Sequence, residues 1–224
     1  MDASTGTGWW YEAGGLIRHN WLVRADPVHI SPFGTWVHTN GTGTDGAIFQ
    51  TETNIENHGD KDVDVVVKAT LYDADGTAVE SASAPAVSVS GGSISKPVVL
   101  PVTVASGVKK WNIQTPALYT AAVELIVGGA VVDGINLTTG HRDVRWDSNK
   151  GLFINDENIK MRGFCDHSNF GGVGGALPDR LNLFRTQVLR SVGGNAWRMA
   201  HNPPSLTRLD YMDALGMVAL DECS

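Results

Sequence analysis

The fold of this chain is decided by the stretch Arg162-Gly-Phe-Cys-Asp-His-Ser-Asn-Phe-Gly-Gly172, an apolar run that gives way to polar residues. Two later stretches repeat this pattern, Asn195-Ala-Trp-Arg-Met-Ala-His-Asn-Pro-Pro204 and Val218-Ala-Leu-Asp-Glu222. Amphipathic segments separate the three, which predicts alternating strands and helices with parallel strands. In such a sheet, functional groups collect where strands give way to loops. We therefore expect one shared rim that contains Asp166, His167, Arg198, His201, Asn202 and Glu222.

The two segments between these strands have helical periodicity. Pro178 suits the first position of a helix, Asp179 suits the positive end of its dipole, and Gly193-Gly194 suits its end. Ser205 is expected to cap the second helix and Gly216 to stop it. The apolar spacing predicts inward faces formed by Leu181, Phe184, Val188, Leu189 and Val192 in the first helix, and by Leu206, Leu209, Met212 and Leu215 in the second.

A short lead-in precedes the first of these strands. Residues 142–147 and 151–160 have the pattern of a hairpin, and a strand is expected from Ile159 to Phe164.

Residues 27–141 have an all-β pattern. In Asp62–Tyr72, apolar residues fall on one face and mostly polar residues on the other. Turn signals such as Asp73-Ala-Asp-Gly76 separate several such strands, which predicts an immunoglobulin-like sandwich. No polar side chains are expected to converge within it, so we interpret it as a spacer or docking surface. Its other inward-facing residues are predicted to be Ala47, Phe49, Thr51, Thr53, Ile55, Tyr119, Ala121, Val123, Leu125, Val127, Val131, Ile135 and Leu137.

Residues 1–26 are rich in aromatic side chains but too few to bury them. The stretch Leu16–Val23 alternates well enough for a strand. We expect this segment to be the end of a larger domain.

Composition and charge exclude several classes of protein. The chain has 224 residues, of which 42% are hydrophobic and 18% are charged, as in ordinary globular proteins of one or two domains. No apolar run approaches the roughly 20 residues that cross a bilayer, so no membrane partner is expected. The net charge of −7, without any cluster of Lys and Arg, argues against nucleic-acid binding.

The cysteines and the amino terminus indicate a reducing compartment. Cys165 and Cys223 follow the first and third expected strands, and two strand spacings of about 4.8 Å exceed the reach of a disulfide. We therefore expect both to be reduced. The first residues contain neither a basic segment nor an apolar segment of a signal peptide, which favours a cytoplasmic location.

The rim residues suit recognition of a polyhydroxyl ligand, because donors and acceptors converge from rigid supports. The alternative is structural: Arg198 and His201 would satisfy carbonyls and carboxylates at the strand ends. Glu222 is a possible acid, or else a structural carboxylate. No metal-ligand spacing, phosphate loop or nucleophile elbow is present, so no metal and no cofactor is expected.

Six stretches in order resemble landmarks of glycoside hydrolase family 2, the group of β-galactosidases, β-glucuronidases and β-mannosidases. The likeness extends over essentially the whole chain. The stretches are Trp9–Leu22, Trp111–Tyr119, Gly140–Trp146, Ile159–His167, Gly194–Pro204 and Leu220–Glu222.

The resemblance implies a multidomain architecture of β and α/β parts. Residues 1–26 resemble the C-terminal end of a jelly-roll sugar-binding domain, residues 27–141 an immunoglobulin-like β-sandwich, and residues 142–224 the N-terminal portion of a (β/α)8 (TIM) barrel. It also implies that His167, Arg198 and His201 line or support the sugar subsite. Met199-Ala200 departs from the usual Thr-Ser or Cys-Ser of the family.

Members of this family are retaining glycosidases with two catalytic glutamates, after the fourth and seventh barrel strands. Both positions, and most Mg²⁺ ligands of family β-galactosidases, are expected beyond residue 224, so Mg²⁺ is implied only for a full-length relative. No catalytic residue is therefore assigned in this chain, and Glu222 belongs to the third strand. About a third of a barrel is expected, with an open strand edge that favours homo-oligomers.

Three functions are compatible with the resemblance and with the predicted sandwich and rim. The first is a fragment of a retaining hydrolase of terminal β-D-galactosides. The second is a non-catalytic carbohydrate-binding or assembly module, and the third is a hydrolase active only as an oligomer. In each case the expected partner is a β-galactoside or a similar saccharide.

Overall fold

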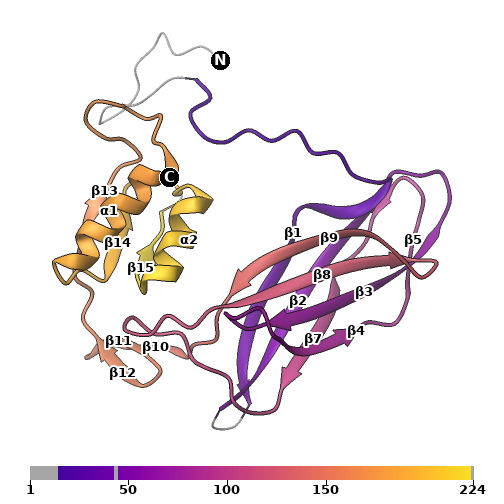
Figure 1. Ribbon diagram of the computed structural model, residues 1–224, viewed down its shortest axis with the longest axis horizontal. Coiled ribbons are helices and arrows are strands. Elements are labelled where there is room, and N and C mark those ends of the chain that lie inside the picture. The colour runs from indigo at the N-terminus through magenta and orange to yellow at the C-terminus, as the bar shows by residue number, and fades with distance from the viewer. Residues whose placement is uncertain (1–14, 43–44, 223–224) are drawn as a thin grey trace. The chain divides into compact units, whose positions relative to one another are not determined.

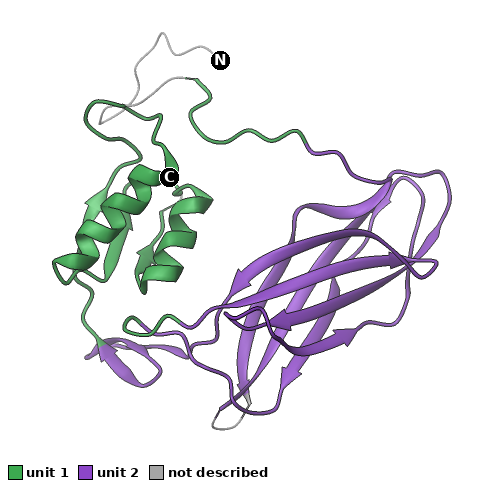
Figure 2. Ribbon diagram, in the orientation of Figure 1, with its two compact units in different colours: residues 1–22, 113–116, 159–224 green, residues 23–112, 117–158 purple. Residues whose placement is uncertain are grey.

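The computed structural model describes residues 15–42 and 45–222. Its contacts divide the chain into two compact units that do not follow the chain in simple order (Figure 2). The larger contains residues 23–112 and 117–158, and the smaller contains residues 1–22, 113–116 and 159–224. The domain boundaries expected from the sequence stay predictions.

The larger unit is built around two antiparallel sheets in two layers (Figure 1). This architecture confirms the expected immunoglobulin-like sandwich. One sheet contains β1 (Val28–Thr42), β2 (Gly46–Asn57), β6 (Ser93–Ile94) and β7 (Val98–Val104). The other contains β3 (Val63–Tyr72), β4 (Ala78–Ser83), β5 (Val87–Val89), β8 (Tyr119–Val127) and β9 (Ala130–Thr139).

The predicted alternation forms the core between these sheets. On β3, Val65, Val67, Ala69 and Leu71 are all at most 1% exposed. The threonines of β2 are buried as predicted, and the Thr51 hydroxyl donates to the Leu100 carbonyl over 3.2 Å. The alternation of side chains along the strand determines which residues enter the core. A buried hydroxyl group needs a hydrogen-bond partner, and the Leu100 carbonyl provides one for Thr51.

The inward face predicted for β9 is wrong in part. Val131 is 57% exposed, because the β8–β9 register shifts between Leu125 and Ile126 and turns the strand by one residue. Val132 packs against the core in its place. Ile135 lies opposite Val123 but remains 36% exposed, because β9 is an edge strand.

The predicted hairpin consists of β10 (Val144–Asp147) and β11 (Gly151–Ile154), and β12 (Glu157–Ile159) completes a three-stranded sheet. The strand expected at residues 159–164 is interrupted at residues 160–162, where the side chain of Asn195 enters the backbone hydrogen bonding. Asn195 donates to the Lys160 carbonyl and accepts from the Arg162 amide, over 3.0 and 2.7 Å.

The smaller unit contains a parallel sheet of β13 (Gly163–Asp166), β14 (Ala196–Met199) and β15 (Val218–Leu220). Helix α1 (Asp179–Ser191) connects the first two strands and α2 (Leu206–Leu215) the last two. Both helices lie on the same side of the sheet (Figure 1). This strand–helix series confirms the expected first part of a (β/α)8 barrel. Neither helix has the length and apolar composition that crossing a bilayer requires.

The predicted inward faces of the helices are wrong in part. Leu189 of α1 and Met212 of α2 are buried as predicted, whereas Phe184, Val188 and Val192 of α1 and Leu206 of α2 are exposed. Arg185 of α1 and Arg208 of α2 instead reach the sheet, where both form ion pairs with Asp166. Asn182 and Thr186 of α1 and Arg208 of α2 are buried although the apolar spacing does not predict them.

The helix ends follow the sequence signals with two exceptions. Pro178 is the N-cap of α1 and not its first helical residue, and Ser205 occupies the N-cap of α2 without a side-chain hydrogen bond to the helix. Gly216 ends α2 in the left-handed conformation, with φ of 68°. A side chain at Gly216 would overlap the carbonyl group of Ile113, so this glycine is required for space as well as for conformation.

Residues 15–26 form no strand within the described part of the chain, so the alternation of Leu16–Val23 is misleading. The expected jelly-roll residues 1–14 lie outside the described residues. Cys165 is a free thiol as expected, whereas Cys223 lies outside the described residues.

Gly216→Ala is expected to destabilise the smaller unit more than Gly193→Ala. Both glycines end a helix with positive φ, 68° and 85°, but a side chain at Gly193 has open space. Gly193→Ala therefore costs only the left-handed conformation, about 1–2 kcal/mol. Hydrogen exchange of the β14 amides measures the loss of stability in each variant. Equal losses of stability in the two variants would contradict the overlap with Ile113.

We propose that the chain self-associates through its smaller unit. Phe164 on β13 and Leu220 on β15 are 67% and 49% exposed on the edge strands of the described sheet, and Phe184, Val188 and Val192 are exposed on α1. Exposed apolar edges pair with other chains. Sedimentation velocity at micromolar concentration should show dimers or larger species that Phe184→Ser weakens. Phe33→Ser, on the sandwich, is the matched control, and a compact monomer contradicts the proposal.

Candidate functional site

Three of the predicted rim residues meet at the C-terminal ends of the parallel strands. Arg198 lies on β14, His201 follows that strand, and Glu222 follows β15. Arg198 Nη2 lies 2.6 Å from Glu222 Oε1, and His201 Nδ1 lies 2.8 Å from Glu222 Oε2. Arg198 Nη2 and His201 Nδ1 are 3.4 Å apart. These three side chains therefore lie together, and their role in binding a ligand stays a prediction.

Cys165 and His167 extend this group from the end of β13. The Arg198 guanidinium donates to Cys165 Sγ over 3.2 Å, because Cys165 and Arg198 are paired residues of neighbouring strands. The rings of His167 and His201 meet edge to face with centroids 5.5 Å apart. Asn202 is exposed next to His201. The C-terminal end of the parallel sheet thus carries several hydrogen-bonding groups of different kinds close together.

The charges at the rim keep Glu222 ionised. The hydrogen bond from His201 is the largest cause that lowers the pKa of the Glu222 carboxyl group; burial opposes it, and the positive charge of Arg198 lowers the pKa further. The hydrogen bond to Cys165, followed by the charge of Glu222, raises the pKa of Arg198. A general acid needs a raised pKa, so this environment suits Glu222 as an acceptor and works against its predicted role as an acid.

Asp166 is buried and differs from the other predicted rim residues. Its carboxylate forms ion pairs with Arg185 of α1 and Arg208 of α2. Burial lowers the pKa of Arg185, which nevertheless stays charged as arginines do. Arg208 also lies over the Trp197 ring, with its guanidinium carbon 4.9 Å from the ring centroid. The residue predicted to contact sugar therefore joins both helices to the first strand.

Arg185 also supports the loop that follows β13. It donates to the carbonyl oxygens of His167 and Asn169 over 3.3 and 3.2 Å. The His167 side chain is thereby held near the rim by a guanidinium group that is itself fixed by Asp166.

A second arginine supports the loop after β14. Arg18 donates to the carbonyl oxygens of Pro203 and Pro204 over 2.5 and 3.3 Å, and His19 pairs with Asp179 at 2.8 Å. Residues 15–22 thus belong to the same unit as the rim and support the loop that carries His201 and Asn202.

Sequence reasoning missed all three supporting arginines. The available signal is at Arg208, which lies four residues before the buried Met212 on the inward face of α2. A charged residue at core spacing predicts a buried partner, and the nearest candidate at a strand end is Asp166. No comparable signal exists for Arg18, because its partners are backbone carbonyls.

The described rim residues do not fit a Mg²⁺ site. Mg²⁺ requires oxygen ligands in octahedral geometry. Glu222 is already engaged by Arg198 and His201, and both oxygens of Asp166 face guanidinium groups.

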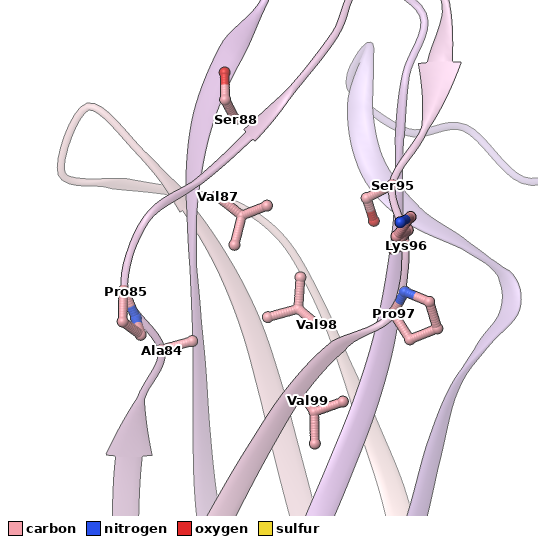
Figure 3. Close-up of a pocket in the computed structure, with 9 residues that line it drawn as sticks. All are labelled: Ala84, Pro85, Val87, Ser88, Ser95, Lys96, Pro97, Val98 and Val99. Atoms are coloured by element: carbon pink, nitrogen blue, oxygen red, sulfur yellow. The ribbon is translucent and has the colours of Figure 1, made fainter.

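The sandwich has a hollow of its own, between the β4–β5 connection and the start of β7 (Figure 3). Its lining is mainly apolar, with Lys96 as the only charged residue among those that line it. Of the side chains drawn there, only those of Ser88, Ser95 and Lys96 are polar. Elsewhere in the sandwich, His29, Glu56 and His58 do converge, which corrects the expectation that no polar side chains meet there.

Comparison with known families identifies the chain. The sequence model of glycosyl hydrolases family 2 matches residues 28–142, and the model of the TIM barrel domain of the same family matches residues 147–224. The chain belongs to glycosyl hydrolase family 2. Five of the six stretches that resemble this family lie wholly or partly within the matched residues, whereas Trp9–Leu22 precedes them.

Relatives of this family 2 chain have two kinds of name. It is 31% identical to a β-galactosidase of Bacteroides ovatus over 95% of this chain and 25% of the relative. It is 27% identical to a β-glucuronidase of Formosa agariphila over 95% of this chain and 22% of the relative. The chain therefore spans about a quarter of the length of these relatives.

Solved structures show the same relation. A family 2 member from Bacteroides cellulosilyticus superimposes with a TM-score of 0.89 and 27% identity, over 96% of this chain and 29% of that one. A β-glucuronidase of the family superimposes with a TM-score of 0.82 and 25% identity, over 88% of this chain and 21% of that one. The fold of the family 2 chain is therefore that of its relatives.

His201→Ala is expected to raise the pKa of Glu222 toward its ordinary value, and Arg198→Ala to raise it by less, since the His201 hydrogen bond is the larger cause. Carbon-13 NMR titration of the Glu222 carboxyl group measures both. The stabilisation associated with the lowered pKa is present above the unfolded value and is lost as pH falls through the folded value.

Arg162→Ala is the matched control, because Arg162 is exposed at the opposite end of β13. It should leave the Glu222 titration unchanged. An ordinary pKa for Glu222 in the parent chain would contradict the described network.

Proposed function

We propose that the rim at the ends of β13, β14 and β15 binds the sugar of a β-galactoside, as part of a retaining family 2 glycosidase. The observation that carries this proposal is the network in which Arg198 and His201 both contact the Glu222 carboxylate, at 2.6 and 2.8 Å. It offers donors and an acceptor from strand ends whose positions the sheet determines.

Such a network matches the hydrogen-bonding needs of a sugar. Each hydroxyl group donates one hydrogen bond and accepts others, so it pairs well with an adjacent cation and carboxylate. Arg198 and Glu222 are each partly exposed, with 37% and 25% of their side-chain surface accessible. Free hydrogen-bonding positions on both groups are thus open to a ligand, and their mutual pairing orients them beforehand.

The charge of the rim favours a neutral sugar over a uronic acid. A glucuronate carboxylate needs a cation that is not already neutralised. Among the described residues at this end of the sheet, Arg198 is paired with Glu222, and Arg185 and Arg208 are paired with Asp166. This argument supports a galactoside, although relatives of the chain include both β-galactosidases and β-glucuronidases.

We do not assign bond cleavage to these residues. Retaining hydrolysis needs two carboxyl groups about 5 Å apart, one of them with a raised pKa. Asp166 is held by two arginines and the pKa of Glu222 is lowered, so neither suits the acid role. The hypothesis of a hydrolase formed by oligomers of this chain, with these carboxylates as catalysts, is disfavoured for the same reason.

D-Galactose is expected to bind the chain more tightly than D-glucuronate in isothermal titration calorimetry. His201→Ala should weaken galactose binding about tenfold, because it removes a hydrogen-bonding partner of the sugar and one of the two groups that orient Glu222. Line broadening of the His167 and His201 ring resonances on galactose addition would place the ligand at the rim.

Arg162→Ala is again the matched control, because it removes a guanidinium at the far end of β13. It should bind galactose as the parent does. Tighter binding of glucuronate would overturn the galactoside assignment, and unchanged galactose binding by His201→Ala would overturn the rim as the binding site.

A further inference from the structure

Three metal-binding side chains meet at one end of the sandwich. His29 on β1 and Glu56 on β2 are directly paired residues of neighbouring antiparallel strands. His58 lies two residues after Glu56, and a chain in extended conformation places such residues on the same face. The backbone itself therefore brings the three together, from two strands whose register is determined by the core.

The distances between the potential ligand atoms are those of a preformed site. His58 Nε2 lies 2.7 Å and His29 Nε2 lies 3.6 Å from the same Glu56 oxygen, Oε2. One ligand atom from each residue lies within 4.8 Å of the others. Bonds of about 2.0–2.1 Å in tetrahedral geometry separate ligand atoms by about 3.3 Å. Small side-chain rotations are sufficient to reach that spacing.

The hydrogen bond at the other nitrogen of His29 prepares this ring for a metal. His29 Nδ1 lies 2.8 Å from the carbonyl oxygen of Asp26. A carbonyl oxygen only accepts, so Nδ1 carries a proton and Nε2 is the nitrogen that would coordinate an ion. A histidine oriented by a backbone carbonyl is the usual arrangement around bound metals.

Glu56 and His58 are already in direct contact with each other, because His58 Nε2 lies 2.7 Å from Glu56 Oε2. An ion bound by both groups would replace the proton that they share, so metal binding at this site is expected to release a proton.

The site is partly shielded and remains accessible. The side chains of His29 and Glu56 are 16% and 17% exposed, whereas that of His58 is 65% exposed. The rings of His29 and His58 are nearly parallel, with an angle of 6° and centroids 5.3 Å apart. An ion can therefore reach the cluster from solvent on the side of His58.

We propose that His29, Glu56 and His58 bind a divalent transition-metal ion of the zinc type, with a water molecule in the fourth position. Two imidazoles and one carboxylate suit Zn²⁺, whereas Mg²⁺ and Ca²⁺ prefer oxygen ligands alone. The site is separate from the rim residues, which belong to the other unit.

The bound ion would secure the start of the sandwich. The His58 amide donates to the Pro27 carbonyl over 2.8 Å, and His29 contacts the Asp26 carbonyl. The ion adds a link between the first residues of β1 and the end of β2, where the ladder of backbone hydrogen bonds stops. Because the metal binds the folded state, it stabilises the sandwich.

Zn²⁺ and Co²⁺ are the probes for this site. Titration of the full chain with Zn²⁺ in calorimetry should show one site that His29→Ala and His58→Ala each weaken about tenfold or more. Co²⁺ should give the visible absorption of a tetrahedral complex, and Zn²⁺ should raise the temperature of sandwich unfolding. Glu56→Gln should reduce all three effects while conserving side-chain shape.

His38→Ala and His201→Ala are the controls, since the first lies elsewhere on β1 and the second at the rim. Both should retain the Zn²⁺ site of the sandwich. The exposed His58 allows a variant that folds, which circular dichroism verifies. The proposal is overturned if the parent binds no Zn²⁺, or if folded His58→Ala binds it as the parent does.

Discussion

The smaller unit depends on the buried carboxylate of Asp166, which is shared by Arg185 and Arg208. One partner comes from each helix, so a single strand end determines how both helices lie on the sheet. Removing one member of such a group leaves a buried charge without compensation, which typically costs about 3–5 kcal/mol. The orientation of the helices, the loop that carries His167 and the packing beside Trp197 all follow from this group.

The rim residues lie at the same strand ends as Asp166 but are more exposed. Asp166 forms its ion pairs inside the unit, whereas the side chains of Arg198, His201 and Glu222 remain partly accessible to solvent. The parallel strands bring the buried Asp166 group and the rim residues to the same end of the sheet. The buried charges stabilise the fold, whereas the accessible charges can contact a ligand. In the sandwich the same distinction applies: Thr51 is satisfied within the core, while His29, Glu56 and His58 meet where the strands end.

Sequence predicted those parts of the fold in which one periodic signal dominates. The alternation in β3 is decisive because every second residue is apolar, and the parallel strands follow from their order with the helices. The helix faces could be predicted only in part, because Phe184 and Val188 have the spacing of core residues but are exposed, and the partner of Arg185 is distant in sequence. The contact between His29 and Glu56 could not be predicted, because it depends on the register of β1 and β2, which residue spacing in the sequence does not give.

Residues 113–116 lie between β7 and β8 of the sandwich in sequence but belong to the smaller unit. The Ile113 carbonyl accepts from Arg190 over 2.5 Å and lies against Gly216, at the ends of α1 and α2. Residues 142–224 expressed separately would therefore lack Ile113, which contacts the ends of both helices. A separately expressed smaller unit would need residues 113–116 as well. Dividing the chain at one position therefore does not give both units intact.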